Sequence, residues 1–345
     1  MNQRKEKNFR LILVFVLSVL FIIPVLRAQT AASGGFQCIV LGSGGGIRES
    51  NLSAYLLAPR RSNDFICLDA GTVYSGIEQA VKLGNFYQVF IPEDSEASRA
   101  GYVYRELIRG YLISHAHLDH LAGLVIASPA ATPTKIYGSS ITIQTLQEHL
   151  FNWEVWPNFA NEGPGMTLDV FDYKSLEFDI ENRIEETKYR VTAYPVSHQE
   201  PYESTAFLIE YLGSYVVYVG DTGADTLEGT NRLNHIWKAV APLIRKGNLN
   251  ALFLECSWPE ERPDTQLFGH LKPSLVIREL SELAKLTDPE NAGKALKGLP
   301  VIVTGIKPSW KEGFDSKYLI YKQLLVRNDL GVKFIIPEQG QLIEF

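Results

Sequence analysis

The stretch Gly110-Tyr-Leu-Ile-Ser-His-Ala-His-Leu-Asp-His-Leu-Ala-Gly-Leu-Val-Ile-Ala-Ser-Pro129 decides the fold of this chain. It begins as a β-branched and aromatic run, typical of a buried strand, and then presents His115, His117, Asp119 and His120. Because strand side chains alternate, His115 and His117 are expected on the same side of the strand end. The apolar segment that follows has a helical pattern, which turns Asp119 and His120 back over that end. The arrangement can supply two adjacent cations.

Three of the seven histidines fall within these six positions, and an aspartate stands beside them. A lone histidine is usually a hydrogen-bonded core or surface residue, and we interpret His149 and His235 in that way. Imidazole and carboxylate groups together suit borderline divalent metals such as zinc. The cluster therefore indicates a metal site.

The short motif His-x-His-x-Asp-His resembles the ligand motif of the metallo-β-lactamase fold. The longer string from His115 to Pro129 resembles the narrower signature of the class II cyclic-nucleotide phosphodiesterases. The resemblance runs from about Phe36 to the C-terminus and is weakest over 151–190. It implies an α/β fold, the αββα sandwich of two mixed β-sheets flanked by helices, as one domain over residues 33–345.

Two more residues match ligand positions of the family, and each follows a predicted strand. His198 lies just beyond the alternating segment 189–196, and Asp221 follows 215–220, the second strand of a predicted hairpin. The resemblance implies two zinc ions, with Mn²⁺ or another divalent ion as the alternative, and the following ligands: His115, His117, His198 and the bridging Asp221 for one ion, and Asp119, His120 and Asp221 for the other.

The resemblance also implies roles around the metals. Asp69, at the end of the predicted strand 64–71, matches an aspartate that orients the ligands from behind; a simple turn residue is the alternative. His270 matches a histidine near the scissile group and is a candidate general acid, against a helix-entry hydrogen bond. Asp119 is the second candidate catalytic residue.

One family motif is altered in this chain. The segment Leu299-Pro-Val-Ile-Val-Thr-Gly-Ile-Lys-Pro308 aligns with a strand that normally ends in Thr-His-Ile-Lys-Pro, whose histidine binds the second metal. Here that position is Gly305, which has no side chain to offer. The second ion is therefore expected to bind more weakly, with water or His270 at the vacant position.

The N-terminus differs in composition from the rest of the chain. Four basic residues within 4–10 precede the apolar run 11–26, and small residues follow. This layout predicts that residues 1–32 are a signal peptide and that the protein is exported, periplasmic or extracellular. An uncleaved anchor is the alternative and would be the only membrane contact, although the run is shorter than the roughly 20 residues that span a bilayer.

Charge and cysteine content narrow the class of protein. The net charge of −6 gives no basic surface for a polyanion, so extended nucleic-acid binding is disfavoured. Cys38, Cys67 and Cys256 lie in apolar, strand-like runs and are predicted to be buried free thiols. A Cys38–Cys67 bridge is the alternative in an oxidising compartment. The sequence is compatible with a homodimer.

Residues 151–190 form the least regular region and are rich in aromatic side chains. Such a stretch is usually core or lid packing. The alternative hypothesis is that Trp153 or Trp156 belongs to a wall on which a purine stacks.

The leading hypothesis is an exported, metal-dependent phosphodiesterase. A metal-bound hydroxide would open 3′,5′-cyclic AMP, or cyclic GMP as a second substrate, to the 5′-nucleotide. The first alternative is another hydrolase of the fold, a lactonase or an RNA-processing nuclease, although the acidic balance disfavours RNA. The second is a catalytically impaired relative that binds nucleotides, because Gly305 replaces the last histidine ligand.

Overall fold

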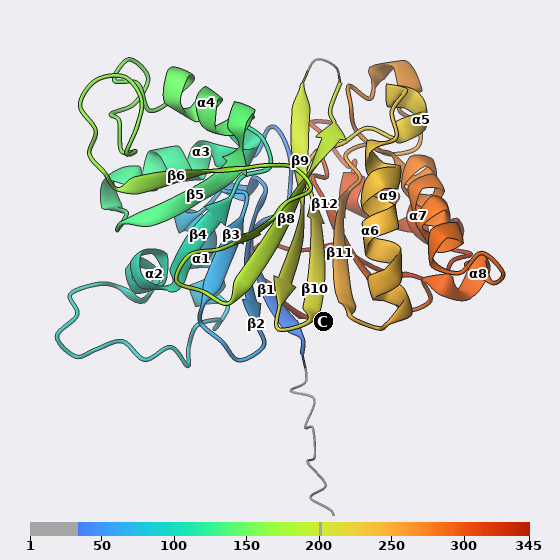
Figure 1. The fold of residues 1–345 in the computed structure, drawn as a ribbon, viewed down its shortest axis with the longest axis horizontal. Coiled ribbons are helices and arrows are strands. Elements are labelled where there is room, and N and C mark those ends of the chain that lie inside the picture. The colour runs from blue at the N-terminus through green and yellow to red at the C-terminus, as the bar shows by residue number, and fades with distance from the viewer. Residues whose placement is uncertain (1–33, 200–201) are drawn as a thin grey trace, which may run out of the picture. The chain divides into compact units, whose positions relative to one another are not determined.

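The computed structural model describes residues 34–199 and 202–345. The predicted signal peptide or anchor, residues 1–32, lies outside the described residues. Within the described ranges, no helix has both the length and the apolar character that crossing a membrane requires. The domain over residues 34–345 is built from two seven-stranded sheets with helices on their outer faces (Figure 1).

The first sheet comes from the N-terminal half of the domain, and the last strand of the chain joins its edge. Its strand order is β14-β1-β2-β3-β4-β5-β6. β14, β1, β2 and β3 pair antiparallel, whereas β3 to β6 are parallel. The strands are β1 (Phe36–Gly42), β2 (Ala54–Pro59), β3 (Phe65–Leu68), β4 (Ile108–Leu112), β5 (Thr134–Ser139), β6 (Phe171–Leu176) and β14 (Leu342–Glu344).

The second sheet comes from the C-terminal half and has the order β13-β12-β11-β10-β9-β8-β7. β7 to β10 form an antiparallel meander, and β10 to β13 are parallel. The strands are β7 (Glu181–Arg183), β8 (Tyr189–Ser197), β9 (Glu203–Tyr211), β10 (Ser214–Val219), β11 (Leu249–Glu255), β12 (Pro300–Thr304) and β13 (Lys333–Ile335).

Helices pack on the outer faces because one side of each is apolar. In α6, Leu233, Ile236, Trp237 and Val240 follow the helical repeat and are all buried. The helices are α1 (Tyr74–Lys82), α2 (Arg99–Tyr102), α3 (Leu118–Ala127), α4 (Ser140–His149), α5 (Asp225–Glu228), α6 (Arg232–Arg245), α7 (Pro273–Thr287), α8 (Ala292–Ala295) and α9 (Ser316–Val326), with 3-10 turns at Glu49–Asn51, Ser128–Ala130 and Asp264–Gln266 and a π-helical turn at Val103–Leu107.

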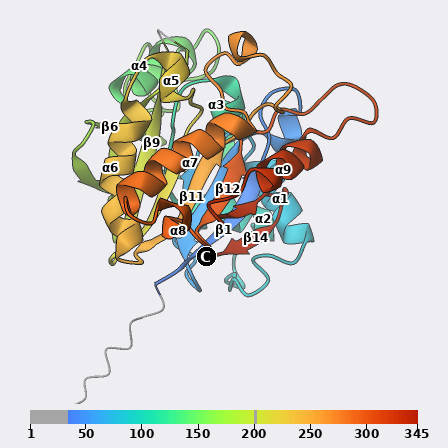
Figure 2. The same ribbon diagram turned by 90° about the vertical axis from the view of Figure 1, so that its right-hand side faces the viewer.

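The core has one layer between the sheets and one under the helices of each outer face. In the middle layer Tyr55 of the first sheet meets Tyr218 and Phe253 of the second, with ring centroids 6.0 and 5.6 Å apart. Figures 1 and 2 show α1 to α4 beside the first sheet and α6, α7 and α9 beside the second. The predicted αββα arrangement of two mixed sheets is confirmed.

Two local predictions have different outcomes. The region 151–190 is irregular only in its first half, because it also contains β6 and β7. The alternation of buried Phe171 and Tyr173 in β6 was obscured by the surrounding aromatic residues, and β7 is a short edge strand. Cys38, Cys67 and Cys256 are buried free thiols, as predicted.

The sheets bring several strand ends to one edge of the domain. β3 and β4 are parallel to each other, and so are β10, β11 and β12. The carboxyl ends of parallel strands meet at the same edge of a sheet. The residues that follow these strands, and those that follow β8, form the candidate site.

Candidate metal centre

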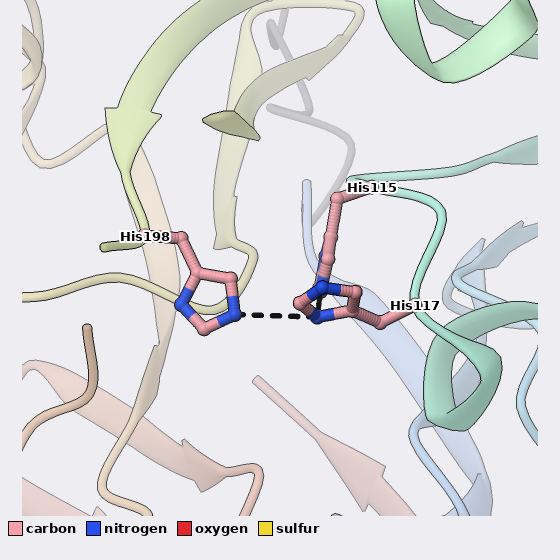
Figure 3. A group of neighbouring side chains, drawn as sticks. All are labelled: His115, His117 and His198. Carbon is pink, nitrogen blue, oxygen red and sulfur yellow. Dashed lines mark hydrogen bonds between the residues drawn. The ribbon is translucent and has the colours of Figure 1, made fainter. Parts of the chain in front are cut away.

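Three imidazole rings converge at this edge (Figure 3). Nε2 of His115 lies 3.0 Å from Nδ1 of His117, and Nε2 of His198 lies 3.3 Å from the same nitrogen. Two nitrogens that bind zinc tetrahedrally at about 2.0–2.1 Å are roughly 3.3 Å apart. The three nitrogens therefore have the spacing of ligands to one ion.

Contacts behind the rings hold them in place. Nδ1 of His198 donates to the carbonyl oxygen of Gly269 at 2.8 Å, so its Nε2 faces His117 with a lone pair. Gly269 has a φ of +71°, and a Cβ there would lie 2.6 Å from the carbonyl carbon of His198, so the approach requires glycine. Nδ1 of His115 lies 3.0 Å from the Ser114 hydroxyl.

The charge state of the three rings also suits a metal. Burial lowers the pKa of His115 well below its usual value, and burial with repulsion from neighbouring imidazoles lowers the pKa of His117 and of His198. Neutral imidazole is the form that binds metals. At neutral pH the three imidazoles are therefore in the form that coordinates a metal ion.

A second group of possible ligands joins His115 to His120 and Asp221. Nε2 of His120 lies 3.3 Å from Oδ1 of Asp221, while its Nδ1 donates to Oδ2 of Asp69 at 2.7 Å. Asp69 is fully buried and also accepts from the amide and hydroxyl of Ser114 and from the hydroxyl of Tyr218. The structure thus places Asp69 directly behind His120, where the resemblance suggested.

The donors of this second group fit a divalent cation. Nε2 of His120 is buried and has no hydrogen-bond partner among the described residues. Because Nδ1 donates to Asp69, Nε2 is the nitrogen that faces a carboxylate oxygen of Asp221, and this pair of atoms requires a proton or a metal cation between them. Burial opposes protonation of His120, yet Asp221 and Asp69 outweigh it and raise the pKa well above its usual value. The pocket therefore attracts positive charge.

Asp119 is not a member of these ligand groups. Its Oδ2 accepts from the amide of Gly46 at 3.2 Å and lies 3.7 Å from Nζ of Lys307. It belongs to none of the three ligand groups found among the described residues. Asp119 therefore lies outside the three ligand groups, and its predicted role as a ligand of the second ion stays a prediction.

His270 and Glu255 form a buried pair beside the cluster. Nδ1 of His270 donates to Oε1 of Glu255 at 2.8 Å and lies 3.6 Å from Oδ2 of Asp221. Glu255 also accepts from the amides of Thr222, Ser257 and Leu271. His198, Asp221 and His270 form a third possible ligand group. The sequence reasoning assigned no role to Glu255, although its place at the end of β11, like those of the other strand-end residues, was a usable signal.

Gly305 lies at the cluster, as its alignment suggested. Its φ is +66°, and a Cβ at this position would point at Oδ1 of Asp221 from 3.4 Å, without a closer obstacle. Histidine is among the residues enriched in this left-handed region. A histidine at 305 could therefore reach the second group of donors.

The remaining histidines and the tryptophans of the aromatic region lie elsewhere. His149 is exposed next to Glu148, and His235 contacts Asp179 at 2.6 Å, so both are surface or structural residues, as interpreted from the sequence. Trp156 donates to the hydroxyl of Ser128, one residue past the C-terminus of α3. Asp119 is at the other end of that helix, and at 1.5 Å per residue the separation is roughly 13 Å.

Comparison with known proteins identifies close relatives. The family model for class-II cAMP phosphodiesterases matches residues 34–340. A 3′,5′-cyclic-nucleotide phosphodiesterase of Aliivibrio fischeri is 39% identical over 329 residues, which cover 95% of this chain and 98% of that protein.

Solved structures support the same grouping. Unliganded yeast PDE1 has a TM-score of 0.76 and 25% identity, covering 90% of this chain and 99% of that one. The metallo-β-lactamase fold protein YhfI from Bacillus subtilis has a TM-score of 0.57 and 17% identity, covering 90% of this chain and 100% of that one. The second likeness confirms the predicted fold.

Proposed function

This chain belongs to the class-II cAMP phosphodiesterase family, and on that premise we propose that it hydrolyses 3′,5′-cyclic nucleotides to 5′-nucleotides. The observation that carries the proposal is the convergence of His115, His117 and His198 beside the His120–Asp221 pair. Family membership favours cyclic nucleotides over a lactone or RNA.

The proposed cofactor is zinc, because imidazole nitrogens dominate the donor set. His115, His117 and His198 would hold one ion, and His120 with Asp221 the other. When bound, such ions lower the pKa of a water and neutralise charge on the phosphoryl oxygens. The ring spacing and the unpartnered nitrogen of His120 support this assignment.

The protein's own groups then orient the reaction. Asp69 holds His120 in one tautomer, and Glu255 holds His270 with Nδ1 protonated. We assign His270 as the general acid: in its imidazolium form, with Glu255 bound at Nδ1, it gives the Nε2 proton to the 3′-oxygen as the new water–phosphorus bond forms and the bond from phosphorus to that oxygen breaks, which leaves a neutral imidazole. The products are a 5′-phosphate and a free 3′-hydroxyl.

A second candidate function follows from Gly305. Without a side chain at this position, the second group of donors lacks the ligand that the family alignment suggested, and the chain would bind nucleotides without efficient turnover. The deciding experiment is release of 5′-AMP from cyclic AMP by the parent and by Gly305→His, with and without chelator. Chelator-sensitive turnover by the parent supports the phosphodiesterase; turnover by the variant alone supports the impaired relative.

We also propose that the protein is exported, on the evidence of its basic and apolar N-terminal residues. Fractionation of cells that express the full chain tests this. Activity confined to the cytoplasmic fraction contradicts the proposal.

A further inference from the structure

A cavity of about 490 Å³ lies against one border of the metal cluster. Gly46 and Lys307 line it, and both contact Oδ2 of Asp119, at 3.2 and 3.7 Å. The groups that hold Asp119 therefore form one end of the cavity. A substrate with its phosphate at the metals could extend its remaining part into this space.

One wall of the cavity carries a stacked aromatic ring and a guanidinium group. Trp258 lines the cavity, and the guanidinium carbon of Arg262 lies 4.3 Å from the centre of its ring. Trp258 follows Ser257, whose hydroxyl is 3.2 Å from Nδ1 of His270. The aromatic wall thus begins one residue from a side chain that contacts the proposed general acid.

A second wall comes from the loop between β12 and α9, which extends outward from the domain in Figure 2. Trp310 on this loop lines the cavity and is 84% exposed, and Phe314 also lines it and is 43% exposed. Exposed apolar side chains mark a binding surface when they lie together rather than singly, and Trp310 and Phe314 line the same cavity. Both walls therefore offer flat rings to the same space.

The neighbouring alternatives offer less to a nucleobase. A second cavity of about 620 Å³ shares Gly45 and Phe314 with the first, but charged side chains form much of its lining. One of them, Lys317, already donates to Glu338 at 2.8 Å. Trp156, the purine wall suggested by the sequence, lies at the far end of α3 from Asp119. Tyr202 lies against the cluster, with its ring centre 5.8 Å from that of His117, but it lines neither cavity, whereas several aromatic rings line the 490 Å³ cavity together.

We propose that this cavity is the base subsite and that the purine of the cyclic nucleotide lies between Trp310 and the Trp258–Arg262 stack. Bases stack on aromatic rings and on guanidinium planes without regard to sequence. The volume falls within the usual range of about 300–1,000 Å³ for ligand pockets. The inference rests on the proposed function, because it assumes that the phosphate sits at the metal cluster.

The test compares Trp310→Ala with the control Trp153→Ala, which removes another solvent-exposed tryptophan away from the cavity. We expect Trp310→Ala to raise KM for cyclic AMP by roughly 5- to 100-fold with kcat within about twofold. Trp258→Leu should act in the same direction. Ribose 3′,5′-cyclic phosphate without a base should be turned over equally by parent and variants.

A second measurement separates this inference from the proposed function. Binding of 5′-AMP, measured by calorimetry, does not require turnover, so it tests the subsite even if the parent hydrolyses no cyclic nucleotide. Weaker 5′-AMP binding by Trp310→Ala but not by Trp153→Ala supports the base subsite. Equal 5′-AMP affinities in parent and Trp310→Ala, or an equal loss in Trp153→Ala, would overturn it.

Discussion

The carboxylate of Asp69 and the imidazole of His120 meet at 2.7 Å in a site that is almost completely closed to water. Because Asp69 accepts from Nδ1, the contact determines which nitrogen of His120 is free. That free nitrogen faces Asp221. A side chain that touches no substrate thus determines whether the second group of donors can form.

Asp69→Asn should weaken this group. The amide cannot supply the negative charge that holds Nδ1 protonated, and loss of such partners typically costs about 10–100-fold in metal affinity or activity. Competition with a chromogenic chelator measures the affinity. The control is Asp172→Asn, which removes the charge of a partly exposed carboxylate that contacts Lys174 and Asn161; an equal effect in both variants would contradict the role of Asp69.

Removal of divalent ions should abolish turnover and lower the midpoint of thermal unfolding. A ligand present at 100 times its dissociation constant stabilises the native state by about 2.7 kcal/mol. Differential scanning calorimetry after chelation and after zinc is restored measures the change. If the unfolding midpoint is the same in both states, His115, His117 and His198 do not bind a metal ion that stabilises the native state.

Gly305→His should tighten the weaker ion by roughly 10–100-fold, since it adds a ligand directed at Asp221. Gly305→Ala is the matched control, because it carries the same backbone strain at a φ of +66° without the imidazole. Isothermal titration with zinc gives both affinities. Equal affinities in the two variants would show that position 305 does not reach the ion.

His270→Asn should lower kcat for cyclic AMP by about 10²–10⁴-fold, because the 3′-oxygen then leaves unprotonated. Bis(4-nitrophenyl) phosphate has a leaving group that needs no proton, so its hydrolysis should fall much less. Metal content measured in parallel separates this role from coordination through the His198–Asp221–His270 group. An equal loss on both substrates together with lost metal would assign His270 as a ligand instead.

Glu279 in α7 does not belong to the metal cluster, and it should make the free energy of unfolding depend on pH. Burial raises its pKa from 4.5 to about 7, although Trp237 and the amide of Asp225 donate to it. The native state then binds the proton more tightly than the unfolded chain, so stability falls as pH rises from 4.5 to about 7.

The Glu279→Gln variant has no such proton to lose. Its free energy of unfolding relative to the parent should therefore rise by about 2–3 kcal/mol between pH 4.5 and pH 8. Urea unfolding followed at several pH values measures the difference. A difference that does not change with pH would mean that Glu279 titrates normally.

The local part of the site was the predictable part. His115 to His120 form one continuous motif, and His198 and Asp221 follow strands whose alternation is visible in the sequence. Glu255 was missed because an acidic residue at a strand end resembles a turn residue until its contact with His270 is seen. That contact depends on how β11 and the loop before α7 pack.

The cavity beside Asp119 was less accessible to sequence reasoning. Its walls come from the segments around Trp258 and Trp310, which no local periodicity connects. The high aromatic content of 151–170 favoured Trp153 or Trp156 as the stacking residue instead. Composition identified rings that could stack on a base, but only the tertiary arrangement shows which of them lie near the cluster.

The division of the domain into two sheets has a consequence for biosynthesis. His115, His117 and His120 follow a strand of the first sheet, whereas His198 and Asp221 follow strands of the second. A nascent chain that ends before His198 has neither group of donors complete, and one that ends before Asp221 still lacks the second group. The first group can therefore bind a metal ion only after the residue that follows β8 has been synthesised, and the second only after the residues that follow β10.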